Sequence, residues 1–233
     1  MTTRVASILR TAFLSIPLSV TCSYSTPAFE AEEIVEVDKE PHHRVEFENE
    51  SVRILDVNIP MGVTTLYHRH RFDNVAVVLR NADASSQSLG EPDADVGARR
   101  AGAIYFSSAP GEGYVHRVKV GGSNAYHLID VELKQPSSAE PLTDNAVAKA
   151  SFDNERIRVF TVKLEPGGPS VSLTLRSGVL VVLPGATVEQ IGLDGSSERV
   201  IGDLRPWRWR KPGTWTLRDV SSEPAVAIAI EIK

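Results

Sequence analysis

The chain repeats part of its own sequence, and this repeat limits the folds that it can adopt. Residues 47–62 read FENESVRILDVNIPMG, and residues 152–167 read FDNERIRVFTVKLEPG. The two stretches align without a gap at an offset of 105 residues. The identical pairs are Phe47 and Phe152, Asn49 and Asn154, Glu50 and Glu155, Arg53 and Arg158, Val57 and Val162, and Gly62 and Gly167. Such a repeat within 233 residues predicts two similar units in tandem, each the size of a small domain.

Hydrophobic residues recur at every second position in short segments of both units. Examples are residues 52–59 (VRILDVNI) and 126–133 (YHLIDVEL), and Gly, Pro, Asn and Asp separate these segments. Period two is typical of strands with one buried face, and many short strands indicate a sandwich or barrel. We therefore expect an all-β chain with units over residues 36–134 and 147–233. A polar linker rich in Pro and Ser, residues 135–146, joins them.

Residues 1–28 have the composition of a targeting segment rather than of a folded element. They begin with basic Arg4 and Arg10, continue with a short, mostly apolar run, and end with small residues before a cleavage point after Ala28. A secretory signal fits this order and predicts a secreted or periplasmic protein. Ten of the 28 residues are Ser or Thr, so an organellar transit peptide stays open as the alternative.

Charge and composition exclude several classes of partner. The formal net charge of −5 argues against a nucleic-acid-binding protein, because such proteins present a dense basic surface to the phosphates. No run of 18 apolar residues occurs, so we expect no membrane-spanning helix. The lone cysteine, Cys22, rules out an intramolecular disulfide and a cysteine-based zinc site.

All six histidines lie in the first unit. His68 and His70 stand two residues apart on a strand-like segment, so both imidazoles face the same side and together can bind a divalent metal. His116 lies on a later segment and shares its face with Tyr114. His127 shares a face with Ile129, Val131 and Leu133, and we therefore expect it to face the interior. The remaining two are His42 and His43, for which capping or packing is expected.

The spacing of these residues resembles two motifs of the cupin superfamily. Gly62, His68, His70, Asn74 and Asn81 follow the pattern G-x5-H-x-H-x3,4-E-x6-G, with Asn in place of the Glu and of the closing Gly. The segment from Gly102 through Pro110 and Gly111 to His116 resembles the pattern G-x5-P-x-G-x2-H-x3-N, but it is three residues longer and has Val120 at the last position. The resemblance covers both halves and implies a bicupin: two tandem cupin barrels of the jelly-roll, or double-stranded β-helix, type.

The resemblance implies a metal centre in the first barrel. Because Asn74 replaces the usual ligand Glu, the implied ligands are His68, His70 and His116. Asn74, Tyr114 and Tyr105 are then expected around the metal and the substrate. The implied cofactor is a divalent transition metal, with Fe first and Mn, Ni, Cu or Zn as alternatives.

The second unit lacks this set of residues. At the same offset, His68, His70 and Asn74 correspond to Leu173, Leu175 and Val179, and His116 aligns approximately with Leu217. Apolar side chains cannot bind a metal, so we expect a solidly packed barrel with a structural role or a role in forming a homodimer.

Three-histidine cupins include dioxygenases, so the resemblance implies first a dioxygenase acting on a small, anionic molecule. A non-catalytic bicupin that binds a small ligand or serves a structural role is the second hypothesis. The loss of the ligand Glu, the longer second motif and the loss of the second site favour it. A metal-dependent isomerase or lyase is a further alternative, with His127 as the proton-transferring base.

Overall fold

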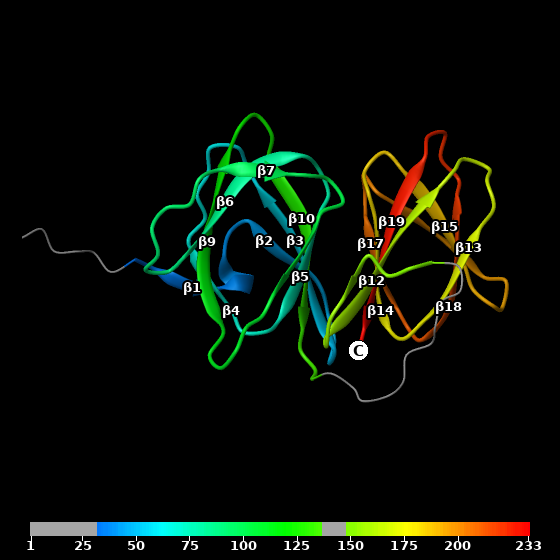
Figure 1. Cartoon of the computed structure of the whole chain (residues 1–233), viewed down its shortest axis with the longest axis horizontal. Coiled ribbons are helices and arrows are strands. Elements are labelled where there is room, and N and C mark those ends of the chain that lie inside the picture. The colour runs from blue at the N-terminus through cyan, green and yellow to red at the C-terminus, as the bar shows by residue number, and fades with distance from the viewer. Residues whose placement is uncertain (1–31, 137–147) are drawn as a thin grey trace, which may run out of the picture. The chain divides into compact units, whose positions relative to one another are not determined.

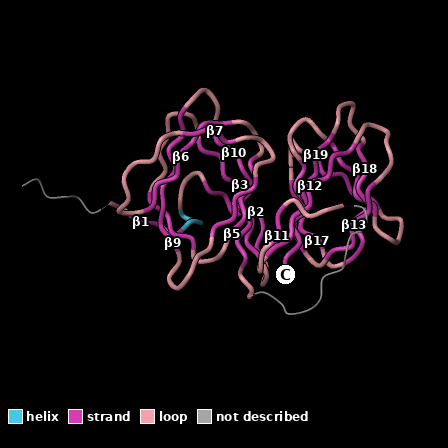
Figure 2. The backbone as a smooth tube through the Cα atoms, in the orientation of Figure 1, coloured by secondary structure: helices cyan, strands magenta, loops and turns pink. Residues whose placement is uncertain are grey.

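The computed structural model describes residues 32–136 and 148–233. The predicted targeting segment, residues 1–28, and most of the predicted linker, residues 135–146, lie outside the described residues. Nearly all regular structure in the described part is strand, with one short 3-10 turn, η1 (Val37–Lys39) (Figure 2). The predicted all-β class is confirmed. No helix in residues 32–136 and 148–233 is long and apolar enough to cross a membrane.

The first barrel is built from two five-stranded sheets (Figure 1). One sheet has the strand order β1-β4-β9-β6-β7, and the other has the order β2-β3-β10-β5-β8. The strands are β1 (Ile34–Glu36), β2 (His43–Glu48), β3 (Val52–Ile59), β4 (Tyr67–His70), β5 (Asn74–Val78), β6 (Ala82–Ser88), β7 (Gly97–Arg99), β8 (Ile104–Ser107), β9 (Tyr114–Gly121) and β10 (Tyr126–Leu133). Strands distant in sequence pair in both sheets, as a jelly roll requires.

The second barrel repeats this strand order. Its sheets are β11-β12-β19-β14-β17 and β13-β18-β15-β16, which match β2-β3-β10-β5-β8 and β4-β9-β6-β7 position by position. The strands are β11 (Phe152–Asp153), β12 (Ile157–Leu164), β13 (Val171–Leu175), β14 (Gly178–Val182), β15 (Thr187–Ile191), β16 (Ser197–Ile201), β17 (Trp207–Arg210), β18 (Gly213–Asp219) and β19 (Ala225–Ile232). The prediction of two tandem jelly-roll barrels is therefore confirmed.

The repeated Asn and Gly residues shape equivalent turns in the two barrels. The Asn49 side-chain oxygen accepts two backbone N–H groups of the turn between β2 and β3, each at 2.8 Å. Asn154 accepts the corresponding two between β11 and β12, each at 2.9 Å. Gly62 and Gly167 follow β3 and β12 with φ of 76° and 65°, a left-handed conformation that glycine adopts without steric cost. These contacts explain why the residues recur.

The repeated arginines form equivalent ion pairs. Arg53 Nε donates to Glu132 Oε2 at 2.6 Å, which joins β3 to β10. Arg158 Nε donates to Glu231 Oε2 at 2.7 Å, which joins β12 to β19. Glu132 and Glu231 are both fully buried, so each carboxylate depends on its arginine for charge compensation.

Three hydrophobic clusters stabilise the fold. One fills the first barrel, one fills the second, and the third draws on the outer faces of strands from both barrels. The shared cluster includes Ile54, Val75, Ile129, Val131, Val159, Val179, Trp207, Ile228 and Ile230. Strand β10 is consequently buried on both faces, with one face toward its own barrel interior and the other toward the shared cluster.

Candidate metal centre

Strands β4 and β9 bring three histidines together inside the first barrel. The two strands are antiparallel neighbours, and their register places His68 opposite His116 and His70 opposite Tyr114. One ring nitrogen from each of the three histidines lies within 4.8 Å of the other two. The ring centroids of His68 and His116 are 4.4 Å apart, and His70 lies 5.3 Å and 5.2 Å from them. The clustering predicted from the sequence is therefore present.

The hydrogen bonds of His68 and His116 leave one nitrogen of each ring free for a ligand. Nδ1 of His68 lies 3.0 Å from the carbonyl oxygen of Leu66, which can only accept, so Nδ1 carries the proton and Nε2 carries a lone pair. Nδ1 of His116 bonds the Ser86 hydroxyl at 2.7 Å. Both Nε2 atoms are buried and have no hydrogen-bond partner among the described residues. Two buried imidazole nitrogens that converge without a partner fit a divalent metal, which would bind each through its lone pair.

Burial keeps these imidazoles neutral. Burial, with the nearby His43 and His70 acting in the same direction, lowers the pKa of His68 to about 3. Burial, with His68 and His70 beside it, also holds the pKa of His116 well below its usual value. A metal needs the unprotonated imidazole, so the site has the required protonation state at neutral pH.

A polar group of residues surrounds Nδ1 of His70. The side-chain amide of Asn74 lies 2.8 Å from this nitrogen, Glu132 Oε1 lies 3.4 Å away, and Asp130 Oδ2 lies 3.7 Å away. The Tyr114 ring stacks on the His70 ring at 4.9 Å, and its hydroxyl accepts a hydrogen bond from Asn74 at 2.8 Å. Such contacts fix the orientation of a ligating imidazole. Asn74 and Tyr114 are thus beside the histidines, as expected.

Asp130 and Glu132 belong to this centre although sequence reasoning did not single them out. Both are on β10, and Asp130 Oδ1 and Glu132 Oε1 are buried without a hydrogen-bond partner among the described residues. Burial raises the pKa of Asp130 to about 6, while His70 acts in the opposite direction. Two acidic residues two positions apart in an otherwise apolar strand were the available signal, because buried carboxylates need a specific reason.

His43 is a second residue whose part in the centre the sequence did not reveal. Its ring lies 4.5 Å from that of His68, and it lines the cavity that His70 and His116 also line. Its Nδ1 bonds the buried Glu40 Oε2 at 2.6 Å, and burial lowers its pKa. His43 therefore packs against the candidate metal ligands.

His127 does not face the barrel interior, which corrects the expectation for this residue. Its Nε2 bonds Asp56 Oδ1 at 2.7 Å on the outer face of the sheet, and it does not line the cavity beside the histidines. Its face of β10 does include Ile129 and Val131, but those residues belong to the cluster shared by the two barrels. The inner face of β10 is the alternate one, which carries Leu128 and Asp130.

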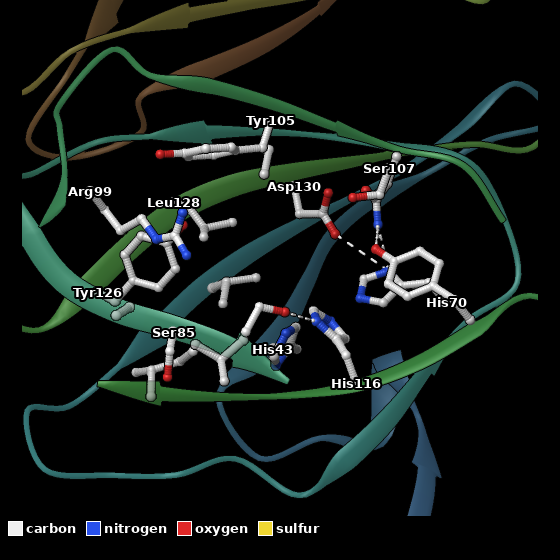
Figure 3. A pocket seen from close by; sticks show the side chains of 18 residues that line it. His43, His70, Ser85, Arg99, Tyr105, Ser107, His116, Tyr126, Leu128 and Asp130 are labelled. Carbon is white, nitrogen blue, oxygen red and sulfur yellow. Dashed lines mark hydrogen bonds and ion pairs between the residues drawn. The ribbon is translucent and has the colours of Figure 1, made fainter. Parts of the chain in front are cut away.

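A cavity of about 200 Å³ opens from the histidines into the barrel (Figure 3). Its walls are mostly apolar, with Val57, Ile59 and Leu128 among them. Tyr105 lines it at a partly exposed position and has the guanidinium of Arg99 over its ring at 5.1 Å. Tyr105 is thus in the cavity wall, as expected, but on a different strand from the histidines. The size and lining suit a small organic molecule.

The second barrel has apolar side chains at the positions of the histidines. Leu173 and Leu175 are fully or almost fully buried. The register pairs Gly178 with Glu231 as it pairs Asn74 with Glu132, so Gly178 rather than Val179 occupies the place of Asn74. The register pairs Leu173 with Trp215, as it pairs His68 with His116, so Trp215 rather than Leu217 occupies the place of His116. Leu173, Leu175 and Trp215 belong to the cluster that fills the second barrel.

Comparisons with known proteins yield structural neighbours only. No family model matches the chain, and no curated protein matches it. Among solved structures, AerE from Microcystis aeruginosa aligns over 83% of this chain and 98% of its own, with a TM-score of 0.55 and 13% identity. The oxalate decarboxylase of Lactobacillus farciminis in a formate complex aligns over 84% of each chain, with a TM-score of 0.51 and 10% identity.

A variant of the Bacillus subtilis oxalate decarboxylase aligns over 78% of this chain and 69% of its own, with a TM-score of 0.52 and 10% identity. The TM-scores of these three structures support a shared fold, and the low sequence identities leave the reaction open. The fold, its duplication and the position of the histidines agree with one another. The chain therefore has a bicupin fold, with a three-histidine cluster in its first barrel.

Proposed function

We propose that the chain is a metal-dependent enzyme of the dioxygenase type, which acts on a small, anionic molecule in the first barrel. One observation carries the proposal: Nε2 of His68 and Nε2 of His116 are buried and have no hydrogen-bond partner among the described residues, within the three-histidine cluster. The cluster also borders a cavity with space for an organic ligand. His68, His70 and His116 would hold the metal. Fe is the first choice, and Mn, Ni, Cu and Zn are the alternatives.

Three neutral imidazoles leave the full charge of a divalent ion uncompensated, which favours an anionic substrate. When bound, the metal supplies a Lewis acid with open positions for substrate and, if it is iron, for dioxygen. The chain's own residues orient the ligands and exclude water. Asn74 and Tyr114 orient His70, Ser86 and the Leu66 carbonyl orient the other two rings, and the apolar walls exclude water.

A metal-dependent lyase or isomerase is the second candidate, and a specific observation favours it. Such a reaction needs a group that moves a proton, and His127 is outside the cavity. Asp130 is inside it, fully desolvated, and its Oδ1 has no hydrogen-bond partner among the described residues. Asp130 could accept a proton from a substrate held at the histidines.

The metal content of the purified chain is the first test. Protein expressed in metal-replete medium is expected to hold about one equivalent of a transition metal by mass spectrometry, and His68→Ala/His70→Ala is expected to hold none. His127→Ala is the matched control, since it removes a histidine of the same barrel outside the cavity. Absence of metal in the wild type after reconstitution contradicts the proposal and favours the non-catalytic binding protein.

The metal's identity and oxygen consumption then separate the two reactions. Iron-loaded protein that consumes oxygen with enolisable or catecholic acids supports the dioxygenase. Turnover that needs the metal but no oxygen, and that Asp130→Asn abolishes, supports the lyase or isomerase.

A further inference from the structure

An arginine side chain in the cavity wall has no hydrogen-bond or ion-pair partner among the described residues. Arg99 is the last residue of β7 and lines the cavity of the first barrel. Its Nε is buried and has no hydrogen-bond partner among the described residues, and the guanidinium forms no ion pair within them, although the side chain as a whole is half-buried. A buried donor without an acceptor costs folding free energy, and a ligand in the cavity would supply that acceptor.

The surroundings of Arg99 fit a planar anion. The guanidinium carbon lies 5.1 Å from the centre of the Tyr105 ring, a cation–π contact that holds the group in place. Tyr126 lines the same part of the cavity, and burial raises its pKa to about 12, so its hydroxyl stays protonated. A guanidinium presents parallel N–H groups that match the two oxygens of a carboxylate.

The cavity separates Arg99 from the candidate metal centre. Figure 3 shows Arg99 beside Tyr126 at one end, and His70 and His116 at the other. Strand β10 provides a scale, because Tyr126, Leu128 and Asp130 follow one another along its inner face. Four residues of strand span about 13 Å. Since Asp130 Oδ2 lies 3.7 Å from His70 Nδ1, the polar ends of the cavity are about this far apart.

We propose that Arg99 binds the carboxylate of the substrate, and that the substrate is an arylalkanoic acid whose opposite end reaches the three histidines. The apolar wall between the two ends suits an aromatic ring, and the length suits a ring with a short side chain. This inference names a substrate class for the proposed function and rests on it for the role of the histidine end. It assigns Arg99 as the specificity-determining residue.

Binding measurements with matched probes test the role of Arg99. The probes are 3-phenylpropanoic acid, 3-(3,4-dihydroxyphenyl)propanoic acid and the primary amide of each, titrated calorimetrically into metal-loaded and metal-free full-length protein. The wild type is expected to bind each acid at least about tenfold more tightly than its amide, because a charge-assisted hydrogen bond is lost in the amide. Arg99→Gln is expected to remove this preference, weakening the acids tenfold or more and the amides less than about twofold.

Two further variants keep the test informative. Arg100→Gln removes the exposed neighbouring arginine and should change neither affinity. Arg99→Lys keeps the charge but loses the planar fork, so the acid preference should fall to an intermediate value. Thermal melting of each variant identifies any that fail to fold, and in that case Arg99→Lys carries the comparison.

The outcomes separate this inference from the proposed function. An Arg99-dependent preference for acids in a protein that binds no metal supports the carboxylate site and contradicts the metalloenzyme. Full metal occupancy with equal affinity for acids and amides supports the metal centre and overturns the assignment of Arg99. Failure of both acids to bind either form of the protein also overturns it.

Discussion

The last strands of the two barrels differ in the side chains that they turn inward. Strand β10 turns Tyr126, Leu128, Asp130 and Glu132 toward the first barrel, and the register gives their counterparts on β19 as Ala225, Ala227, Ala229 and Glu231. The pairings with β3 and β12 are otherwise equivalent, so the same backbone supports both sets.

The small residues of β19 leave room that large apolar side chains fill. Leu173, Trp215 and Leu217 are almost completely buried in the second barrel, together with the alanines of β19. In the first barrel, histidines replace Leu173 and Trp215, and a cavity lies beside them. The comparison teaches that the same barrel backbone accommodates either a packed hydrophobic core or a cavity lined by histidines. The side chains on β4, β9 and β10, or on their counterparts in the second barrel, determine which of the two forms.

The Arg–Glu pair that recurs in both barrels illustrates how a structural contact serves a second purpose. In the second barrel, Glu231 uses its free oxygen, Oε1, to accept the backbone N–H of Arg176 at 2.8 Å. In the first barrel, the equivalent oxygen of Glu132 has no hydrogen-bond partner among the described residues and lies 3.4 Å from His70 Nδ1. The pair that holds two strands together in one barrel therefore also contacts a candidate ligand in the other.

Placing the second barrel's residue in the first is expected to have the largest effect. His68→Leu copies Leu173 and removes one of three ligands, so metal affinity should fall by more than about 100-fold, beyond the loss typical of a residue that only orients a ligand. Competition with a chromophoric chelator measures this affinity. Wild-type affinity in His68→Leu would contradict the assignment of the site.

Truncating an interior leucine to alanine should lower the free energy of unfolding more in the second barrel than in the first. Leu217→Ala empties space in a solid core and should lower the free energy of unfolding by about 2–5 kcal/mol. Leu128→Ala enlarges an existing cavity, so we expect a loss below about 2 kcal/mol. Urea denaturation of both variants, with intact metal content checked first, measures the difference. Equal losses would show that the two interiors are packed alike.

Lowering the pH should destabilise the metal-free protein, because a buried histidine of the first barrel takes up a proton more readily in the unfolded chain. The pKa of His68 is about 3 in the folded state against an ordinary 6.5, so the unfolded chain binds the proton and stability falls as the pH drops below 6.5. Between pH 6.5 and 5, His68 alone accounts for about 2 kcal/mol. Urea denaturation in the presence of a chelator should show this slope, and His68→Leu should flatten it.

The glutamates of the two Arg–Glu pairs provide the smallest expected effect and the sharpest contrast between the barrels. Glu132→Gln should weaken metal binding by about tenfold, because His70 loses an anionic neighbour. Glu231→Gln should leave metal affinity unchanged and lower only the melting temperature, since Arg158 loses its partner carboxylate. Equal metal affinities in the two variants would limit Glu132 to a structural role.

Much of this architecture can be predicted from the sequence because its signals are local. Period-two segments predict strands, the offset of 105 residues predicts duplication, and the spacing of His68 and His70 predicts a shared face. These inferences need no knowledge of which strands become neighbours.

The parts that were missed depend on packing between distant segments. Strand β10 is buried on both faces because a second barrel covers its outer side, so alternation alone could not tell which face carries His127. His43 reaches the centre from β2, and Arg99 reaches the cavity from β7. Their positions follow from strand order, which a single sequence does not reveal.

The hydrophobic cluster shared by the two barrels has an evolutionary consequence. A duplicated unit that loses its binding residues is ordinarily free to be deleted. Here deletion of residues 148–233 would expose Val52, Ile54, Val75, Ile129 and Val131 as one apolar surface on the surviving barrel, which is an aggregation hazard. Loss of the second barrel would therefore lower the solubility of the first, independently of any ligand that the second barrel binds.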